Sequence, residues 1–352
     1  RQRQMCIRDR AISSADHRED MSLIKEIGAN GIRLAHYPHS DEFYTLCDRE
    51  GMLVWAEIPL VGKALDTPEF TENMKTELTE LIRQNFNHPS IFCWSLCNEL
   101  SKGDVKGLIS ELNSVSHRED PGRLTVLAAN VEKRPENAVP DIMAFNTYPG
   151  WYWAEPSEMK STLERWNRQC GNKGIAVSEY GAGANVWHHW QTGKKTPKAD
   201  GVFHPEEWQA TVHEQTYDAI KRSGFAWGSF VWNMFDFASA SRNEGDMPGM
   251  NDKGLVSYDR KIRKDAFYFY QSEWSEEPVV HIASRRDVAR RDSLTDVKVY
   301  TNCETVRLKV NGKDCGSPER NGSICIWRKL GLEHGENQVE AFGHRGGQEF
   351  SD

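Results

Sequence analysis

Two carboxylates, Glu99 and Glu179, each follow an apolar stretch that is typical of a buried strand. A carboxylate in such a place is costly unless it is paired, hydrogen-bonded or functional. Two facing carboxylates in an aromatic-lined cleft are what cleavage of a glycosidic bond requires. One protonates the leaving oxygen, and the other attacks the anomeric carbon or activates water. The alternative is that both are structural ion-pair partners, for example of Arg33.

Other polar side chains end the neighbouring predicted strands, and the carboxyl ends of parallel strands lie on one face of a barrel. These residues are Arg33, His36, Glu57, Asn98, Asn146, Tyr148, Tyr180, Trp232 and Asp236. Polar residues also fill barrel interiors, so a structural role is favoured for Glu57, Asn146 and Asp236. The loops after the strands add aromatic residues that are either sugar platforms or ordinary packing, namely Trp151, Tyr152, Trp153, Trp187 and Trp190.

The segments that must position these side chains alternate between strand and helix. Apolar runs predict strands at 31–37, 52–60, 91–100, 123–130, 141–148, 175–181 and 225–237. Helical periodicity and end signals predict helices at 13–28, 41–50, around 74–86, 104–118, 157–169, 206–222 and 265–274.

This alternation predicts an α/β fold with a parallel sheet. Seven strands are visible and the pattern begins on a helix, so we expect a (β/α)₈ TIM barrel that lacks its first strand. The opening decapeptide is at most a poor substitute for that strand. A doubly wound open sheet is the alternative. It requires a Gly-rich phosphate loop after an early strand, and none occurs in the sequence.

The pattern changes after Glu277. Short alternating segments at 279–284, 297–302, 306–312, 323–330 and 337–343 are separated by Asn-Gly and Gly-rich turns, which predicts a small immunoglobulin-like β-sandwich. The opening RQRQMCIRDR fits neither helix nor strand and resembles a translated sequencing adapter. We therefore expect a non-native segment at 1–10, a barrel at 11–276 and a sandwich at 277–352.

Composition excludes several classes of protein. The 352 residues include 44 basic and 52 acidic side chains, a net charge of −8. With no long basic block, a dedicated nucleic-acid partner is not expected. No run approaches 18 apolar residues, so we expect no membrane span. No cluster of Cys and His has zinc-binding spacing, and we predict no metal and no cofactor. The 12 Trp residues are concentrated in the predicted barrel.

Seven motifs in order carry a resemblance to glycoside hydrolase family 2, the family of β-galactosidases, β-glucuronidases and β-mannosidases. They are NGIRLAHYP, CDREGMLVWAEIPL, NHPSIFCWSLCNE, FNTYPGWY, SEYG, FVWNMFDF and NDKGLVSYDR, and they lie between Asp16 and Trp274. The resemblance implies a retaining mechanism on an oligosaccharide or another β-glycoside. In such a mechanism the two carboxyl groups lie about 5–5.5 Å apart.

The resemblance also implies a role for each matching residue. Glu179 matches the nucleophile and Glu99 the general acid/base, whose pKa we expect to be raised by the negative Glu179. The remaining implied substrate-site residues are Asn98, at the 2-hydroxyl; Arg33 and Tyr148, orienting the nucleophile; Trp232, stacked under the sugar; and His36, at a sugar hydroxyl.

For the sugar, the motifs around 47–60 and 251–270 resemble the β-galactosidase branch most, which makes that our main expectation. The alternative is a β-glucuronidase, because Asn251 and Lys253 fit the Asn-x-Lys pattern with which that group holds the sugar carboxylate. An amide and an ammonium both donate hydrogen bonds to a carboxylate.

Family members carry further β-domains before the barrel that this sequence lacks. We therefore expect the 352 residues to be an N-terminally truncated piece, and an inactive fragment or a carbohydrate-binding remnant is the competing hypothesis. By resemblance the protein is periplasmic or secreted in a bacterium, but the sequence itself assigns neither a location nor an oligomeric state.

Overall fold

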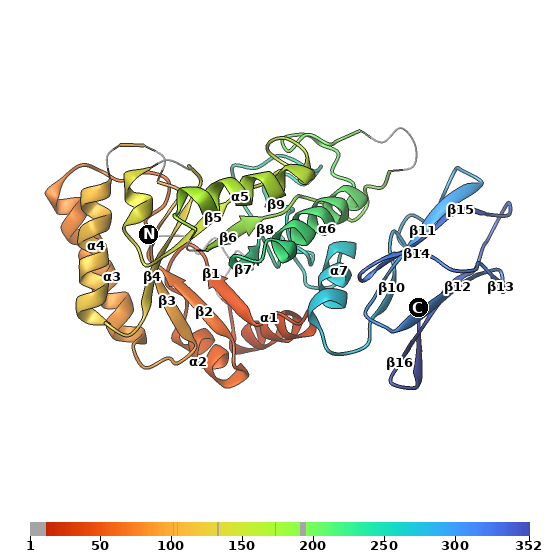
Figure 1. The fold of residues 1–352 in the computed structure, drawn as a ribbon, viewed down its shortest axis with the longest axis horizontal. Helices are drawn as coiled ribbons and strands as arrows, with labels where there is room; N and C mark the ends of the chain where they lie inside the picture. Colours follow the sequence, from red (N-terminus) through yellow and green to blue (C-terminus); the bar gives the residue numbers. More distant parts are fainter. Residues whose placement is uncertain (1–11, 101, 104, 132–133, 173, 191–194) are drawn as a thin grey trace.

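The computed structural model describes residues 12–100, 102–103, 105–131, 134–172, 174–190 and 195–352, so the expected non-native segment at 1–10 lies outside the described residues. Within them, seven parallel strands form one sheet in sequence order, and the sheet curls into a ring (Figure 1). The strands are β1 (Gly31–Leu34), β2 (Leu53–Glu57), β3 (Ile91–Asn98), β4 (Leu124–Ala129), β5 (Ile142–Asn146), β6 (Ile175–Tyr180) and β7 (Ala226–Val231).

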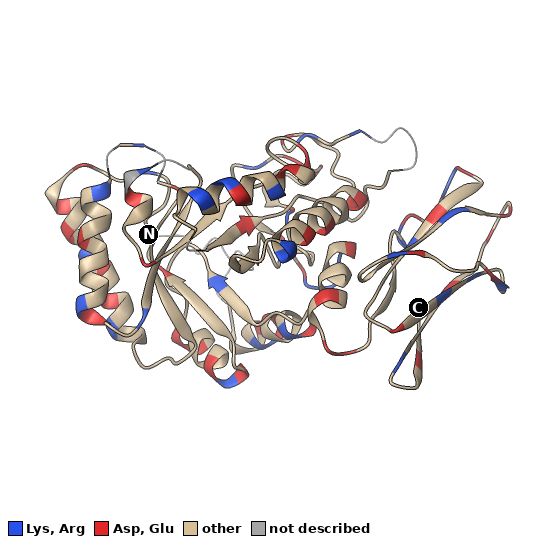
Figure 2. Ribbon diagram, in the orientation of Figure 1, with Lys and Arg blue, Asp and Glu red and all other residues tan. Residues whose placement is uncertain are grey.

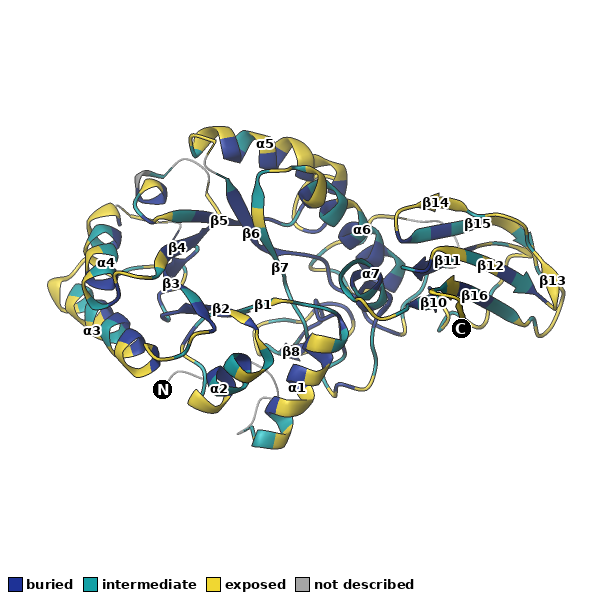
Figure 3. Cartoon of the chain, turned by 60° about the horizontal axis from the view of Figure 1, so that its bottom comes forward, coloured by how far each residue is buried: buried dark blue, intermediate teal, exposed yellow. Residues whose placement is uncertain are grey.

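Helices surround this ring, with their apolar faces toward the strands and their outer faces in solvent (Figure 3). They are α1 (Ser14–Glu26), α2 (Asp41–Glu50), α3 (Pro68–Asn85), α4 (Lys106–Glu119), α5 (Met159–Gln169), α6 (Glu206–Arg222) and α7 (Asp265–Trp274), with short 3₁₀ turns η1 (Pro135–Ala138) and η2 (Pro156–Glu158). This layout places every strand's carboxyl end on one face, as a parallel barrel requires.

The ring is open on one side. In the described part of the chain, no backbone ladder joins β1 to β7. Every residue of β6 is buried, whereas β7 is nowhere fully buried. A cavity of about 520 Å³ lies between the edge strands β1 and β7 and is lined by residues of β1, β7 and α1. The predicted TIM-type barrel is confirmed, and it has seven strands in the part of the chain that the structure describes. The doubly wound alternative is wrong, because the strand order never reverses.

The last barrel strand is shorter than the predicted 225–237. It ends at Val231, and the backbone of Asn233 then bonds with Lys253 and Leu255. Phe237–Ala238 (β8) pairs with Met250–Asn251 (β9) in a hairpin outside the barrel. The apolar run continues from β7 into β8, and side chains of both strands are at least partly buried. Hydrophobicity alone therefore does not show where the chain leaves the barrel. The segment that follows the hairpin, with Lys253, lies against the carboxyl end of β7.

Two four-stranded antiparallel sheets follow and face each other over a core that includes Val299, Leu308 and Trp327. Their strands are β10 (Val280–Ile282), β11 (Leu294–Thr301), β12 (Thr305–Val310), β13 (Lys313–Asp314), β14 (Glu319–Asn321), β15 (Ile324–Gly331), β16 (Val339–Arg345) and β17 (Gln348–Ser351). The predicted sandwich is present. It lies against α6 and α7, where Lys298 Nζ bonds Glu214 at 2.6 Å.

Each of the outer helices α3, α4 and α5 carries both acidic and basic side chains (Figure 2). Among the described residues, no helix is both long enough and apolar enough to cross a membrane.

Candidate active site

Glu179 lies at the centre of a polar cluster at the carboxyl ends of the strands. Its Oε1 accepts a hydrogen bond from Arg33 Nη1 at 2.7 Å, and its Oε2 accepts one from the Tyr148 hydroxyl at 2.5 Å. Arg33 comes from β1 and Tyr148 follows β5, so the curvature of the sheet brings together residues far apart in sequence. Both oxygens are held, which fixes the direction in which this carboxylate faces.

Glu99 follows β3 and belongs to the same cluster. Its backbone has φ +54°, a left-handed conformation that is uncommon for a residue other than glycine and that recurs at active sites. Its Oε1 accepts a hydrogen bond from Asn146 Nδ2 at 2.8 Å. The pKa of Glu99 is raised as expected, but burial is the larger cause and the charge of Glu179 comes second. Glu99 therefore favours the protonated form that a general acid needs.

Glu57, for which the sequence favoured a structural role, lies in the same cluster. Its carboxylate, at the end of β2, accepts hydrogen bonds from Arg33 Nε at 3.1 Å and Trp55 Nε1 at 3.1 Å, and lies 2.8 Å from His36 Nδ1. Burial opposes its ionisation, but Arg33 and then His36 outweigh burial and lower the pKa of Glu57. Glu57 thus holds Arg33, which in turn holds Glu179.

Two asparagines link the two halves of the cluster. Asn98 Oδ1 accepts hydrogen bonds from Arg33 Nη2 at 2.8 Å and from Asn146 Nδ2 at 3.0 Å. Asn146 also contacts Glu99 and accepts a hydrogen bond from the Ser178 hydroxyl at 2.7 Å. Asn146 therefore connects the surroundings of both glutamates, although the sequence favoured a structural role for it.

Trp232 and His36 form the aromatic side of the cluster. Their rings stack with centroids 5.1 Å apart and planes inclined by 18°. Phe237, from the β8–β9 hairpin, meets the Trp232 ring edge-on at 6.0 Å. An indole held between two neighbours has a fixed orientation, which suits a surface for stacking a sugar ring.

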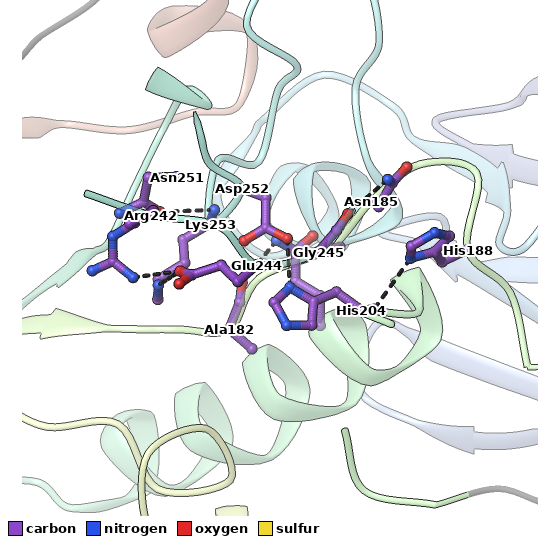
Figure 4. A network of polar contacts seen from close by, with 12 residues as sticks. Ala182, Asn185, His188, His204, Arg242, Glu244, Gly245, Asn251, Asp252 and Lys253 are labelled. Atoms are coloured by element: carbon purple, nitrogen blue, oxygen red, sulfur yellow. Dashed lines mark hydrogen bonds and ion pairs between the residues drawn. The ribbon is translucent and has the colours of Figure 1, made fainter. Parts of the chain in front are cut away.

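Asn251 and Lys253 lie beside this cluster, at the end of the β8–β9 hairpin. Asn251 Oδ1 accepts a hydrogen bond from the Lys253 amide at 3.1 Å. Between them, Asp252 bonds the buried His204 at 2.6 Å, which anchors the segment (Figure 4). The Lys253 ammonium lies 5.2 Å from the ring centroid of Tyr152, and that ring lies 5.1 Å from the Tyr148 ring. A path of contacts thus leads from Lys253 through Tyr152 and Tyr148 to Glu179.

The five loop aromatics have different surroundings. Trp151 is buried, and both it and Trp190 belong to a small apolar cluster with Trp208. Tyr152 and Trp153 are 50% and 40% exposed and line a pocket of about 600 Å³, whereas Trp187 is 74% exposed. Only Tyr152 and Trp153 combine exposure with a concave surface, as a sugar platform requires.

Asp236 has a structural environment, as the sequence favoured. Its Oδ1 accepts hydrogen bonds from Lys264 Nζ and from the Gly254 amide, both at 2.8 Å. Burial raises its pKa to about 7 in spite of Lys264. Within the described ranges, no group of three or more His, Cys, Asp and Glu side chains has an arrangement that could hold a metal ion.

Replacing Arg33 with Met is expected to destabilise the fold by about 3–5 kcal/mol, because it leaves the buried Glu57 carboxylate without its main cationic partner. Urea unfolding of the two chains measures the difference. R83M is the control, since Arg83 pairs with Glu119 on the surface and should leave the unfolding midpoint unchanged. Equal midpoints for R33M and the unaltered chain contradict the assigned role of Arg33.

Residues 1–276 match the family model described as "Glycosyl hydrolases family 2, TIM barrel domain". Residues 292–351 match a model of a domain of unknown function. A curated β-glucuronidase of Bacteroides fragilis is 43% identical over 340 residues, which cover 94% of this chain and 49% of that protein. The chain therefore spans about half the length of this relative.

Solved structures agree with this match. A B. fragilis protein provisionally named a β-galactosidase is 34% identical with a TM-score of 0.91, over 97% of this chain and 51% of that one. Bacteroides uniformis β-glucuronidase 2, solved covalently bound to cyclophellitol-6-carboxylate aziridine, is 31% identical with a TM-score of 0.87, over 97% of this chain and 43% of that one. With its barrel, its polar cluster and a family model covering 276 residues, the chain belongs to glycosyl hydrolase family 2.

Proposed function

We propose that the protein containing this chain is a retaining β-glucuronide hydrolase, with its catalytic barrel at 11–276 and an accessory sandwich at 277–352. The observation that carries this proposal is the position of Lys253, a buried cation next to Tyr152, whose ring contacts the Tyr148 that binds Glu179. The sequence favoured a β-galactosidase. The curated B. fragilis relative is named a β-glucuronidase, which supports the alternative.

In this proposal Glu179 attacks the anomeric carbon and forms a glycosyl ester, while Glu99 gives its proton to the departing glycosidic oxygen. Glu99 then takes a proton from water as that water attacks the same carbon and releases Glu179. Arg33 and Tyr148 orient Glu179 through the hydrogen bonds to its two oxygens. Asn98, His36 and Trp232 are the proposed contacts to the sugar.

The surroundings of Lys253 favour a sugar that carries a carboxylate. The side chain is 1% exposed, and its ammonium has no hydrogen-bond partner among the described residues. A buried cation without hydrogen bonds is costly, so its three donors require an acceptor. The C6 carboxylate of a glucuronide supplies both the acceptor and the opposite charge, whereas the C6 hydroxyl of a galactoside supplies no charge.

The aziridine that labels the B. uniformis relative offers a direct test. Cyclophellitol-6-carboxylate aziridine is expected to add one label to the chain, at Glu179, as intact-mass and peptide mass spectrometry would show. The glucose-configured and galactose-configured aziridines without the carboxylate should react at least about tenfold more slowly. In K253M this preference should fall by roughly ten- to hundredfold, since one charged hydrogen bond contributes about 1.5–3 kcal/mol.

K221M is the control, because Lys221 pairs with Glu273 on the surface and should leave the labelling rates unchanged. Faster reaction of the galactose-configured compound would support a β-galactosidase instead. A label on a residue other than Glu179 contradicts the assigned nucleophile. If none of the three compounds reacts, the chain alone does not form a working cleft, as the fragment hypothesis predicts.

A further inference from the structure

A pair of charged residues in the β8–β9 hairpin faces the ammonium of Lys253. We propose that Arg242 is a specificity-determining residue, because it holds the Glu244 carboxylate away from Lys253 and so leaves Lys253 available to a substrate carboxylate. This inference rests on the proposed function and adds to it an internal competitor for the carboxylate site.

Glu244 is a carboxylate close enough to compete. Its Oε1 lies 3.8 Å from Lys253 Nζ, which is within ion-pair range but too far for a hydrogen bond. Lys253 makes no hydrogen bond through Nζ to any described residue, and its ammonium also lies near the rings of Trp151 and Tyr152. A modest rotation of the Glu244 side chain would therefore place its carboxylate where the substrate's carboxylate is needed.

Arg242 binds the same oxygen of Glu244. Its Nη1 donates a hydrogen bond to Glu244 Oε1, and Nη1 and Nη2 both lie 3.4 Å from the Tyr152 hydroxyl oxygen (Figure 4 shows the Arg242–Glu244 bond). One carboxylate oxygen thus has two cationic neighbours and is hydrogen-bonded to only one of them. Because a charge-assisted hydrogen bond is stronger than a contact at 3.8 Å, Arg242 determines where Glu244 rests.

The backbone around these residues is fixed, so the competition is between side-chain positions. Gly249 N donates to Arg242 O at 2.8 Å, which closes the hairpin. Next to Glu244, Gly245 N donates to Gly201 O at 2.8 Å, and Gly245 O accepts from Asn185 Nδ2 at 2.9 Å. On the other side the Asp252–His204 bond anchors Lys253. In this backbone conformation the Glu244 side chain is therefore within reach of both cations.

Local charge leads to the same expectation. When ionised, Arg242, Glu244 and Lys253 together carry one net positive charge, which attracts a carboxylate. The neighbouring Asp252 carboxylate is bonded to His204 and is the same in every variant. Removing only the charge of Arg242 leaves Lys253 neutralised by Glu244. Removing the charges of both Arg242 and Glu244 restores the net positive charge. If Arg242 acts through Glu244, adding the Glu244 substitution to the Arg242 substitution should therefore restore glucuronide binding.

Calorimetric binding of methyl β-D-glucuronide and methyl β-D-glucoside to the 352-residue chain tests this. R242Q is expected to weaken glucuronide binding at least about tenfold, the effect of losing one charge-assisted hydrogen bond. E244Q should bind glucuronide as well as the unaltered chain or more tightly. The R242Q/E244Q double variant should return to within about threefold of it, and none of the variants should change glucoside binding more than about twofold.

R222Q is the matched control, because Arg222 pairs with Asp218 on the surface of α6 and should change neither affinity. If the double variant binds as weakly as R242Q, Arg242 contacts the substrate itself and the inference is wrong. If R242Q loses affinity equally for both sugars, Arg242 has a merely structural role. If the affinity of R242Q for the glucuronide is unchanged, Glu244 does not compete for Lys253. If the unaltered chain does not prefer the glucuronide, the proposed function fails, and this inference fails with it.

Discussion

Replacing Glu179 with Gln is expected to abolish turnover of an aryl β-glucuronide, with a loss in kcat of about 10⁴- to 10⁶-fold, the range seen when an enzyme loses a residue of its nucleophilic machinery. The amide has the shape of the carboxylate and can still accept a hydrogen bond from Arg33 or Tyr148. It cannot form the glycosyl ester, so the covalent step is lost while the fold is kept. Release of the aryl alcohol, followed by absorbance, measures the effect.

The control for this substitution is E207Q. Glu207 is a carboxylate on α6 that pairs with His189 at 2.8 Å, outside the polar cluster. E207Q should keep kcat within about twofold of the unaltered enzyme, because Glu207 touches no reacting group. Substantial residual activity in E179Q, with kcat unchanged in E207Q, would show that another group performs the attack.

The parts of this fold that the sequence predicts are those that depend on periodicity. Buried strands such as β3 and β6 are short apolar runs, and the helices between them follow the 3.6-residue pattern. The open side of the ring is also predictable, because a ring of parallel strands needs eight to close and the sequence shows seven runs, which are the seven strands of the described residues. The strand ends then identify Glu99 and Glu179, because a carboxylate directly after a buried strand is unusual.

The parts that the sequence does not predict depend on contacts between distant segments. Glu57 looks like an interior residue until β1 is placed beside β2 and Arg33 reaches it. Asn146 is one of many asparagines until its amide is seen to contact both Asn98 and Glu99. Glu244 is near Lys253 in sequence, but the sequence does not show that the chain folds so that the Glu244 carboxylate lies 3.8 Å from the Lys253 ammonium.

The second large effect is expected for Glu99. E99Q should lower kcat by about 10²- to 10⁴-fold, the usual contribution of a general acid or base. The loss should be larger for an alkyl glucuronide than for a nitrophenyl glucuronide, because nitrophenolate leaves without a proton and an alkoxide does not. The ratio of the two rates therefore identifies the acid. Equal losses on both substrates would place Glu99 outside proton transfer.

The pH dependence adds an independent check. Since the pKa of Glu99 is raised by burial and then by the charge of Glu179, Glu99 remains protonated at pH values where a free glutamate is ionised. The rate should fall as the pH rises through this raised pKa, and E99Q should lose that alkaline limb. When Glu179 becomes an ester its charge disappears, while the contribution of burial remains. The pKa of Glu99 then falls, so the same side chain is protonated for the first step and ready to accept a proton from water in the second.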